Sequence, residues 1–358
     1  MITGLGLVLL GVVGLWVGAE ALVQGASRLG VRYRVSPVLV GVTLVSLGTS
    51  LPELVVSLLA AGRESPDLVL GNVLGSNMAN VGLVLGITAL VRPVRVAERL
   101  GRRDVPAVRV VTLVALPLLL GGVVGRLGAA LLLGLFASYM AVLVRSARRR
   151  PVDTGMDTGE DPVVDAVDAA PSDAGSGSVD AGSGSGAGGV ESPRGAAGAS
   201  GKPGGGRRSP SALRPLLLAV GGALLLVGGG HGIVEGALRL AAVLGLPEVW
   251  VGLSVVALGT SLPELATTVV AALRGRSALA MGNIVGSNLF NLTVVLGGTA
   301  AVFPLAVPQG LVVAEYAATL ALTVLLIPLV LTGRRVSRPE GLGLLVAYGL
   351  AWAWILHI

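Results

Sequence analysis

Apolar stretches long enough to cross a lipid bilayer recur along most of this sequence. The chain has 358 residues, 53% apolar and 13% charged, whereas soluble globular proteins carry about 25% charged residues. A soluble fold of this composition could not cover its apolar surface, so the sequence predicts an all-α integral membrane protein. Helical spans of roughly 20 residues are expected. Ten such spans cover 3–26, 36–62, 67–91, 106–125, 127–147, 213–238, 247–273, 277–303, 309–332 and 340–357.

The positions of lysine and arginine indicate how these spans are oriented. With the N-terminus outside, 23 of the 26 Lys and Arg residues fall in inner loops, and only Arg63, Arg126 and Arg239 fall in outer loops. Cytoplasmic loops of membrane proteins are enriched in Lys and Arg. We therefore expect a multi-pass protein of the plasma membrane with both termini outside. The net charge of +6 reports this orientation rather than a surface for nucleic acid.

Residues 148–212 differ in kind from the rest of the chain, because Gly, Ser, Ala, Pro and Asp dominate them. Such a segment cannot bury enough apolar area to offset the entropy of ordering it. It is expected to be a disordered cytoplasmic linker between a first five-helix half, 1–147, and a second, 213–358. Its acidic residues lack the frame of an EF-hand calcium loop, so we interpret it as a spacer.

The two halves share one sequence motif. Leu47–Leu54 reads LGTSLPEL, and Leu258–Leu265 repeats it 211 positions later. From Val40 to Gly86, 24 of 47 positions are identical to those 211 residues further on. Because each half has an odd number of predicted spans, the second half must enter the membrane from the opposite side. This predicts an inverted-topology repeat, an architecture of secondary transporters.

Each copy of the motif places a proline and an acid in the middle of a predicted span. Pro52 and Pro263 lack an N–H and clash with the carbonyl four residues earlier, so each helix is expected to break there. An ionised carboxylate at the bilayer centre, as expected for Glu53 and Glu264, costs about 2.5 kcal/mol or more. No Lys or Arg lies in the motif-bearing helix cores, so a cation or a proton must compensate the charge.

The next span of each half adds further oxygen-bearing side chains. Ser76 and Asn80 are four residues apart, as are Ser287 and Asn291, so each pair shares one helix face. With the glutamates, the motif hydroxyls and the freed backbone carbonyls, they form a donor set suited to hard cations such as Ca²⁺ and Na⁺. The chain has no cysteine and two histidines, which disfavours sites for softer metals. The cations are expected as transported ions, and no cofactor is predicted.

An enzymatic use of the motif is disfavoured. An intramembrane hydrolase with Ser50 or Ser261 as nucleophile needs a nearby base, and no His or Lys lies in these helices. The sequence therefore predicts a transporter rather than an enzyme.

The paired motif segments resemble the two α-repeats of sodium/calcium exchangers, in the calcium:cation antiporter superfamily. The resemblance implies exchange of Ca²⁺ for Na⁺ by alternating access at a midplane site. It also implies broken second, third, seventh and eighth helices around that site, and first and sixth helices that slide. By matching position, it implies cation ligands from the side chains of Glu53, Ser50, Ser76, Asn80, Glu264, Ser261, Ser287 and Asn291, and from the carbonyls of Ser46, Thr49, Ala257 and Thr260.

One departure from the family pattern and two alternative functions stay open. Exchangers of this kind often have an Asp at one of the positions of Asn80 and Asn291, so the number of coupled Na⁺ ions is undetermined. A Ca²⁺/H⁺ antiporter would load protons on Glu53 and Glu264, and a cation channel would need no counter-ion. The transported ions and the lipid bilayer are the partners that the sequence indicates, and no protein or nucleic-acid partner is inferred.

Overall fold

Helices account for nearly all of the residues that the computed structural model describes. These residues are 2–98, 100–149, 212–244, 258–307, 309–333 and 335–357, and they belong to one folded unit. Helix α8 takes in Arg148 and Arg149 of the predicted linker, and residues 150–211 lie outside the described residues.

Five elements of the second half begin and end 211 residues after an element of the first half, as α12 follows α4 and η4 follows η2. The first half contains α1 (Ile2–Tyr33), α2 (Pro37–Val40), η1 (Gly41–Val45), α3 (Ser46–Thr49), α4 (Leu51–Gly62), α5 (Pro66–Ala79), η2 (Asn80–Val84), α6 (Leu85–Val91), β1 (Val94–Arg95), η3 (Leu100–Asp104), α7 (Val105–Leu120), β2 (Val123–Val124) and α8 (Arg126–Arg149). The second contains α10 (Leu213–Val243), α12 (Leu262–Leu273), α13 (Ser277–Phe290), η4 (Asn291–Val295), α14 (Leu296–Val302), β3 (Leu305–Ala306), α15 (Gln309–Gly333), β4 (Arg335–Val336) and α16 (Arg338–His357). The sequence repeat is therefore also a repeat of secondary structure.

Five helices in the described ranges are long and apolar enough to cross a membrane, and a sixth crossing results if one bent pair is counted. In each of α1, α8 and α10, only 28% of the apolar 18-residue stretch is buried, and large side chains such as Trp16 are exposed. By contrast, 83% of the corresponding stretch in Pro66–Val91 and 94% of that in Ser277–Val302 is buried. Apolar surface of this extent needs lipid around it. The chain is a multi-pass membrane protein with these two segments at its centre.

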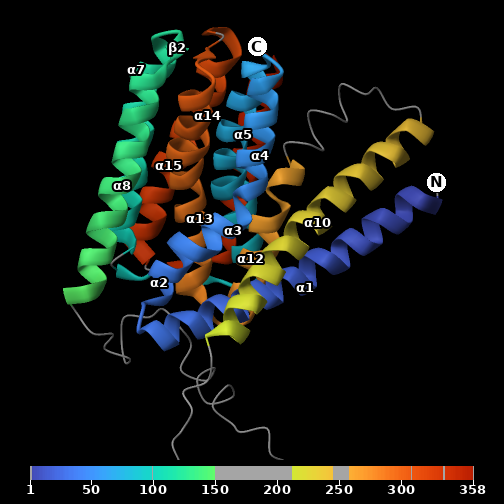
Figure 1. The fold of residues 1–358 in the computed structure, drawn as a ribbon, viewed down its shortest axis with the longest axis vertical. Helices are drawn as coiled ribbons and strands as arrows, with labels where there is room; N and C mark the ends of the chain where they lie inside the picture. The colour runs from blue at the N-terminus through green and yellow to red at the C-terminus, as the bar shows by residue number, and fades with distance from the viewer. Residues whose placement is uncertain are drawn as a thin grey trace, which may run out of the picture. The chain divides into compact units, whose positions relative to one another are not determined.

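Helices α1 and α10 lie side by side along their length (Figure 1). Glycines recur every seven residues where the helices touch, and Gly11 and Gly18 of α1 face Gly229 and Gly222 of α10. A Cβ at Gly11 would lie 2.6 Å from the carbonyl oxygen of Gly229, so no side chain fits there. Small residues let transmembrane helices pack backbone against backbone, and this packing joins α1 to α10.

The second predicted span is bent at the motif. The stretches Pro37–Thr49 and Leu51–Gly62 meet at 43° about Ser50, whose φ of −90° and ψ of 8° leave the helical region. Pro52 lies in the first turn of α4, where a missing N–H costs no hydrogen bond. At the matching place in the second half, Ser261 lies between a helical stretch at 258–260 and α12, while residues 245–257 lie outside the described residues.

The third and eighth predicted spans are not broken, which corrects the expectation for these two segments. Each runs as one helix, Pro66–Val91 and Ser277–Val302, with a five-residue π-helical turn in its middle. No proline follows the first residue of either segment, so the backbone hydrogen bonds of the helix continue. Only their spacing changes, from i→i+4 to i→i+5, at the π-helical turn. The wider turns begin at Asn80 and Asn291, and single π-turns inside helices are frequent at functional sites.

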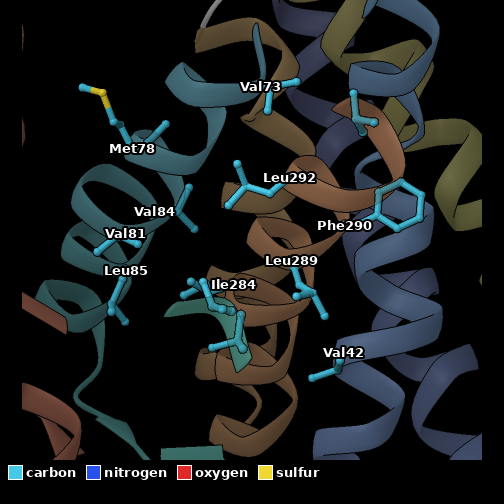
Figure 2. Close-up of a cluster of buried hydrophobic side chains, with 14 of the residues drawn as sticks. Val42, Val73, Met78, Val81, Val84, Leu85, Ile284, Leu289, Phe290 and Leu292 are labelled. Atoms are coloured by element: carbon cyan, nitrogen blue, oxygen red, sulfur yellow. The ribbon is translucent and has the colours of Figure 1, made fainter. Parts of the chain in front are cut away.

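The two halves share one core and are joined at the ends of their helices. Buried apolar side chains such as Val73 of α5 and Ile284 of α13 fill the space between the two central segments (Figure 2). Two short antiparallel pairs, β1 with β4 and β2 with β3, each connect a strand of one half to a strand of the other. The centre of the protein is therefore built from both copies of the repeat.

Candidate cation-binding site

Glu53 and Glu264 occupy equivalent positions in the first turns of α4 and α12, three residues after Ser50 and Ser261. Both side chains are 0% exposed. A helix N-terminus carries partial positive charge and favours an acid in its first turn. Among the described residues, no ion pair involves either carboxylate. Backbone dipoles are thus the fixed positive groups that the fold gives to these two acids.

The two acids come together from the two halves. The Oγ of Ser50 donates a hydrogen bond of 3.0 Å to Oε1 of Glu264, and the carboxylates of Glu53 and Glu264 are close enough to interact electrostatically. The hydroxyl oxygens of Thr49 and Ser287 lie 3.5 Å apart beside them. Two like charges in a buried site repel each other unless a cation or a proton compensates one of them.

Asn72 contacts the backbone of Glu53 and also residues of both halves. Its Nδ2 donates to the backbone carbonyl of Glu53 at 3.0 Å and to Oγ of Ser57 at 2.9 Å. Its Oδ1 accepts a hydrogen bond of 3.4 Å from Thr260 of the second motif. Asn72 therefore positions the backbone of Glu53, and its side-chain amide is already engaged by the protein.

Asn283 repeats two of these three hydrogen bonds in the second half. Its Nδ2 donates to Oγ1 of Thr268 at 3.1 Å, and its Oδ1 accepts from Oγ1 of Thr49 at 3.2 Å. Sequence reasoning missed the supporting roles of Ser57 and Thr268. They are 211 positions apart and both carry a hydroxyl, but a search for identities passes over a Ser–Thr pair.

A second pair of asparagines, Asn77 and Asn288, joins the two central segments directly. Asn77 donates to the backbone carbonyl of Asn288 at 3.2 Å, and Asn288 donates back to the carbonyl of Asn77 at 3.5 Å. Oδ1 of Asn288 also accepts from Nδ2 of Asn80 at 2.9 Å. Oδ1 of Asn80 has no hydrogen-bond partner among the described residues.

Several buried oxygen atoms of the two acids and of the motif-bearing segments have no hydrogen-bond partner among the described residues. They are both carboxylate oxygens of Glu53, Oε2 of Glu264, the hydroxyls of Ser76 and Ser261, and Oδ1 of Asn77, Asn80 and Asn291. A buried polar atom without a partner costs about 1–3 kcal/mol. All of these atoms can accept a cation, and Ca²⁺ takes 6–8 oxygen ligands. The donor set thus fits a hard cation.

Three of the four predicted backbone ligands lie within the described residues. The carbonyl of Ser46 accepts from the N–H of Ser50 at 2.9 Å and from Oγ1 of Thr49 at 3.3 Å. Thr49 and Thr260 lie beside the breaks with buried side chains. Ala257 lies outside the described residues.

The fold and this site define an ion-transporting membrane protein of the antiporter class. The chain belongs to the sodium/calcium exchanger family, because the family model described as "Sodium/calcium exchanger protein" matches residues 3–145 and 214–356. These two matched segments coincide with the two helical halves.

Relatives of known name match over almost the whole chain. The inner membrane protein YrbG of Escherichia coli K12 is 30% identical over 100% of this chain and 98% of its own length. The sodium/calcium exchanger MaX1 of Methanosarcina acetivorans is 29% identical over 96% of this chain and 95% of its own. A solved structure of the sodium-calcium exchanger NCX_Mj, soaked with Na⁺ and Ca²⁺, has a TM-score of 0.74 at 25% identity and covers 99% of this chain and 98% of its own.

Proposed function

We propose that this chain exchanges Ca²⁺ for Na⁺ across the plasma membrane as a secondary active antiporter. The observation that carries the proposal is the approach of two buried carboxylates, Glu53 and Glu264, from opposite halves, without a basic partner in the described part of the chain. Two carboxylates balance the charge of one Ca²⁺, and Na⁺ suits the same oxygen donors. MaX1 and NCX_Mj, both sodium/calcium exchangers by name, support the choice of ions.

The proposed cation ligands come in equal numbers from the two halves. They are the side chains of Glu53, Ser50, Ser76, Asn80, Glu264, Ser261, Ser287 and Asn291, with the backbone carbonyls of Ser46, Thr49, Ala257 and Thr260. The unpartnered oxygens of Ser76, Asn80 and Ser261 support this assignment.

The proposed architecture has ten spans in two inverted five-helix repeats. The elements that recur at an offset of 211 support the repeat, and the odd number of spans in each half inverts it. The distribution of Lys and Arg supports termini on the outside and a linker in the cytoplasm. We treat the linker as a spacer, and the proposal requires no resident cofactor and no protein partner.

Competition for one site makes the exchange obligatory. An empty site leaves Glu53 and Glu264 as uncompensated charges in a medium of low dielectric constant, which raises the cost of passing through an occluded state. Bound Ca²⁺, or bound Na⁺, removes that cost, so the loaded site changes sides. Helices α1 and α10, whose backbones touch, slide as one unit against α12 and open the site alternately.

Reconstituted vesicles test the choice of ions. Ca²⁺ uptake is measured under an outward Na⁺ gradient, under a pH gradient, and with neither gradient. The proposal predicts uptake with the Na⁺ gradient alone. Uptake driven only by the pH gradient identifies a Ca²⁺/H⁺ antiporter instead, and Ca²⁺ flux without any counter-ion gradient identifies a channel.

A further inference from the structure

Glu315 is a second buried acid in the helical unit, away from the two motif breaks. It lies in α15, is 9% exposed, and its carboxylate has no hydrogen bond or ion pair to the described residues. Thr319, one turn further along α15, donates to the backbone carbonyl of Leu74 in α5 at 3.3 Å. Glu315 and Thr319 share a helix face, so the carboxylate also lies on the side of α15 that packs against α5.

The equivalent residue in the first half shows what Glu315 lacks. Asp104 precedes Glu315 by 211 positions and is also buried. Its carboxylate accepts hydrogen bonds from Arg103 at 2.6 and 3.0 Å and from the hydroxyl of Tyr139 at 2.9 Å. In the second half, Ala314 stands where Arg103 stands in the first. The second copy of the repeat therefore has an acid at this position without the neighbouring arginine.

Open space lies beside the unpaired carboxylate. A Cβ built on Gly71 of α5 would have a single neighbour within 4 Å, Oε1 of Glu315 at 3.7 Å. A Cβ on Gly75, one turn further along and buried, would meet nothing within 4 Å. One turn in the other direction, Asp67 is exposed to solvent and close enough to act on Glu315 electrostatically. Asp67, Gly71 and Gly75 therefore form one face of α5 along which an ion could approach Glu315.

We propose that Glu315 of α15 and Asp67 of α5 form a second Ca²⁺-binding site between these two helices, separate from the pair Glu53 and Glu264. Asp67 lies one helical turn from Gly71 on the side nearer the surface. Water supplies the remaining ligands, because the glycine face leaves room for it and Ca²⁺ readily keeps water in its shell. With the orientation proposed above, this site opens to the outside. Helix α5 contributes to both sites, since Asn72, the residue after Gly71, donates to the carbonyl of Glu53. The site itself stands on the geometry of α5 and α15 and does not depend on which ion drives exchange.

Equilibrium dialysis of the purified full-length protein with radioactive Ca²⁺ tests the second site. The double variant E53Q/E264Q removes the central acids and is expected to retain one Ca²⁺ per chain. Adding E315Q is expected to abolish this residual binding, whereas adding the control E235Q, which removes an acid of α10 that pairs with Arg239, is expected to leave it unchanged. No residual Ca²⁺ in the double variant, or residual binding that survives E315Q, overturns the proposal.

Thermal unfolding distinguishes loss of the Ca²⁺ site from loss of the folded structure. Ca²⁺ is expected to raise the Tm of E53Q/E264Q and to leave that of E53Q/E264Q/E315Q unchanged. Without Ca²⁺, the triple variant is expected to be at least as stable as the double variant, because a buried unpaired acid is gone. A triple variant that still gains stability from Ca²⁺ contradicts the site. Failure of Na⁺-driven uptake in the native chain tests the exchange proposal alone and leaves this binding result intact.

Discussion

Glu20 of α1 forms an ion pair with Arg274, which directly follows α12, with 2.6 Å between Oε1 and Nη2. The two residues are 254 positions apart. Gln24, one turn along α1, donates to the same carboxylate at 2.5 Å. Arg276 adds a hydrogen bond of 3.2 Å to the carbonyl of Val23. One end of α1 is thus fastened to the turn between α12 and α13.

Releasing this fastening should loosen α1 without unfolding the protein. An exposed ion pair contributes about 0.2–1 kcal/mol. E20Q is therefore expected to change the ratio of molecules in which this end of α1 is released to those in which it is attached by up to about fivefold. Hydrogen exchange of residues 270–280, followed by mass spectrometry, should become faster. The control E235Q, which breaks a pair within α10 alone, should leave this segment unchanged. Equal protection in E20Q and the native chain contradicts the fastening role.

Removing the amide of Asn283 should weaken the contact between the halves. N283A removes the amide that donates to Oγ1 of Thr268 and the oxygen that accepts from Oγ1 of Thr49, and an unpaired buried group costs about 1–3 kcal/mol. We expect a lower Tm in detergent and a parallel loss of Ca²⁺ uptake. The control S138A removes an exposed hydroxyl bonded only to its own helix and should change neither quantity. An unchanged Tm in N283A would show that this amide is not structural.

The sequence predicted the acids of this site better than its scaffold. Glu53 and Glu264 stand out because an acid after a proline in an apolar span is costly, and the duplication gives their equivalence. The roles of Asn72 and Asn283 depend on contacts more than 180 residues apart, which one sequence does not contain. The repeated motif marks Thr49 and Thr260, but it does not tell which amide each of them contacts.

The shape of the central helices was also only partly predictable. Pro52 indicates a break because proline removes a donor, and the chain bends there. Asn80 and Asn291 start π-turns instead of breaks, and no proline in the interior of their helices removes a backbone donor. Helix α1 likewise continues past the predicted residue 26 to Tyr33, since hydropathy marks where a span leaves the bilayer and not where its helix ends. It stops before Arg34, whose φ is 54°.

The glycine contact between α1 and α10 makes a separate prediction. G11A places a methyl group 2.6 Å from the carbonyl oxygen of Gly229 and must push the helices apart, which typically costs 1–3 kcal/mol. We expect a lower Tm and slower Ca²⁺ uptake. G6A is the matched control, because a Cβ there meets nothing within 4 Å and alanine favours the helix. If both variants behave alike, close packing of these helices is not required for transport.

Deleting residues 152–205 should preserve transport. The segment is rich in Gly and Ser, a composition typical of spacers, and we expect the residues that remain on either side of the deletion to join the two halves. Na⁺-driven Ca²⁺ uptake by the deletion variant should match that of the native chain at equal amounts of inserted protein. A well-inserted but inactive deletion variant would show that the segment is more than a spacer.

The most direct test of the central claim compares Ca²⁺ uptake by the native chain, E53Q and E264Q in vesicles with an outward Na⁺ gradient. Glutamine keeps the size of each side chain and one acceptor oxygen, which the hydroxyl of Ser50 can still use at position 264, while removing the charge. Membrane insertion, measured on the same vesicles, is expected to be equal in all three. The account predicts that each single variant loses uptake. Uptake at the native rate in either variant would show that the paired carboxylates do not bind the transported ion.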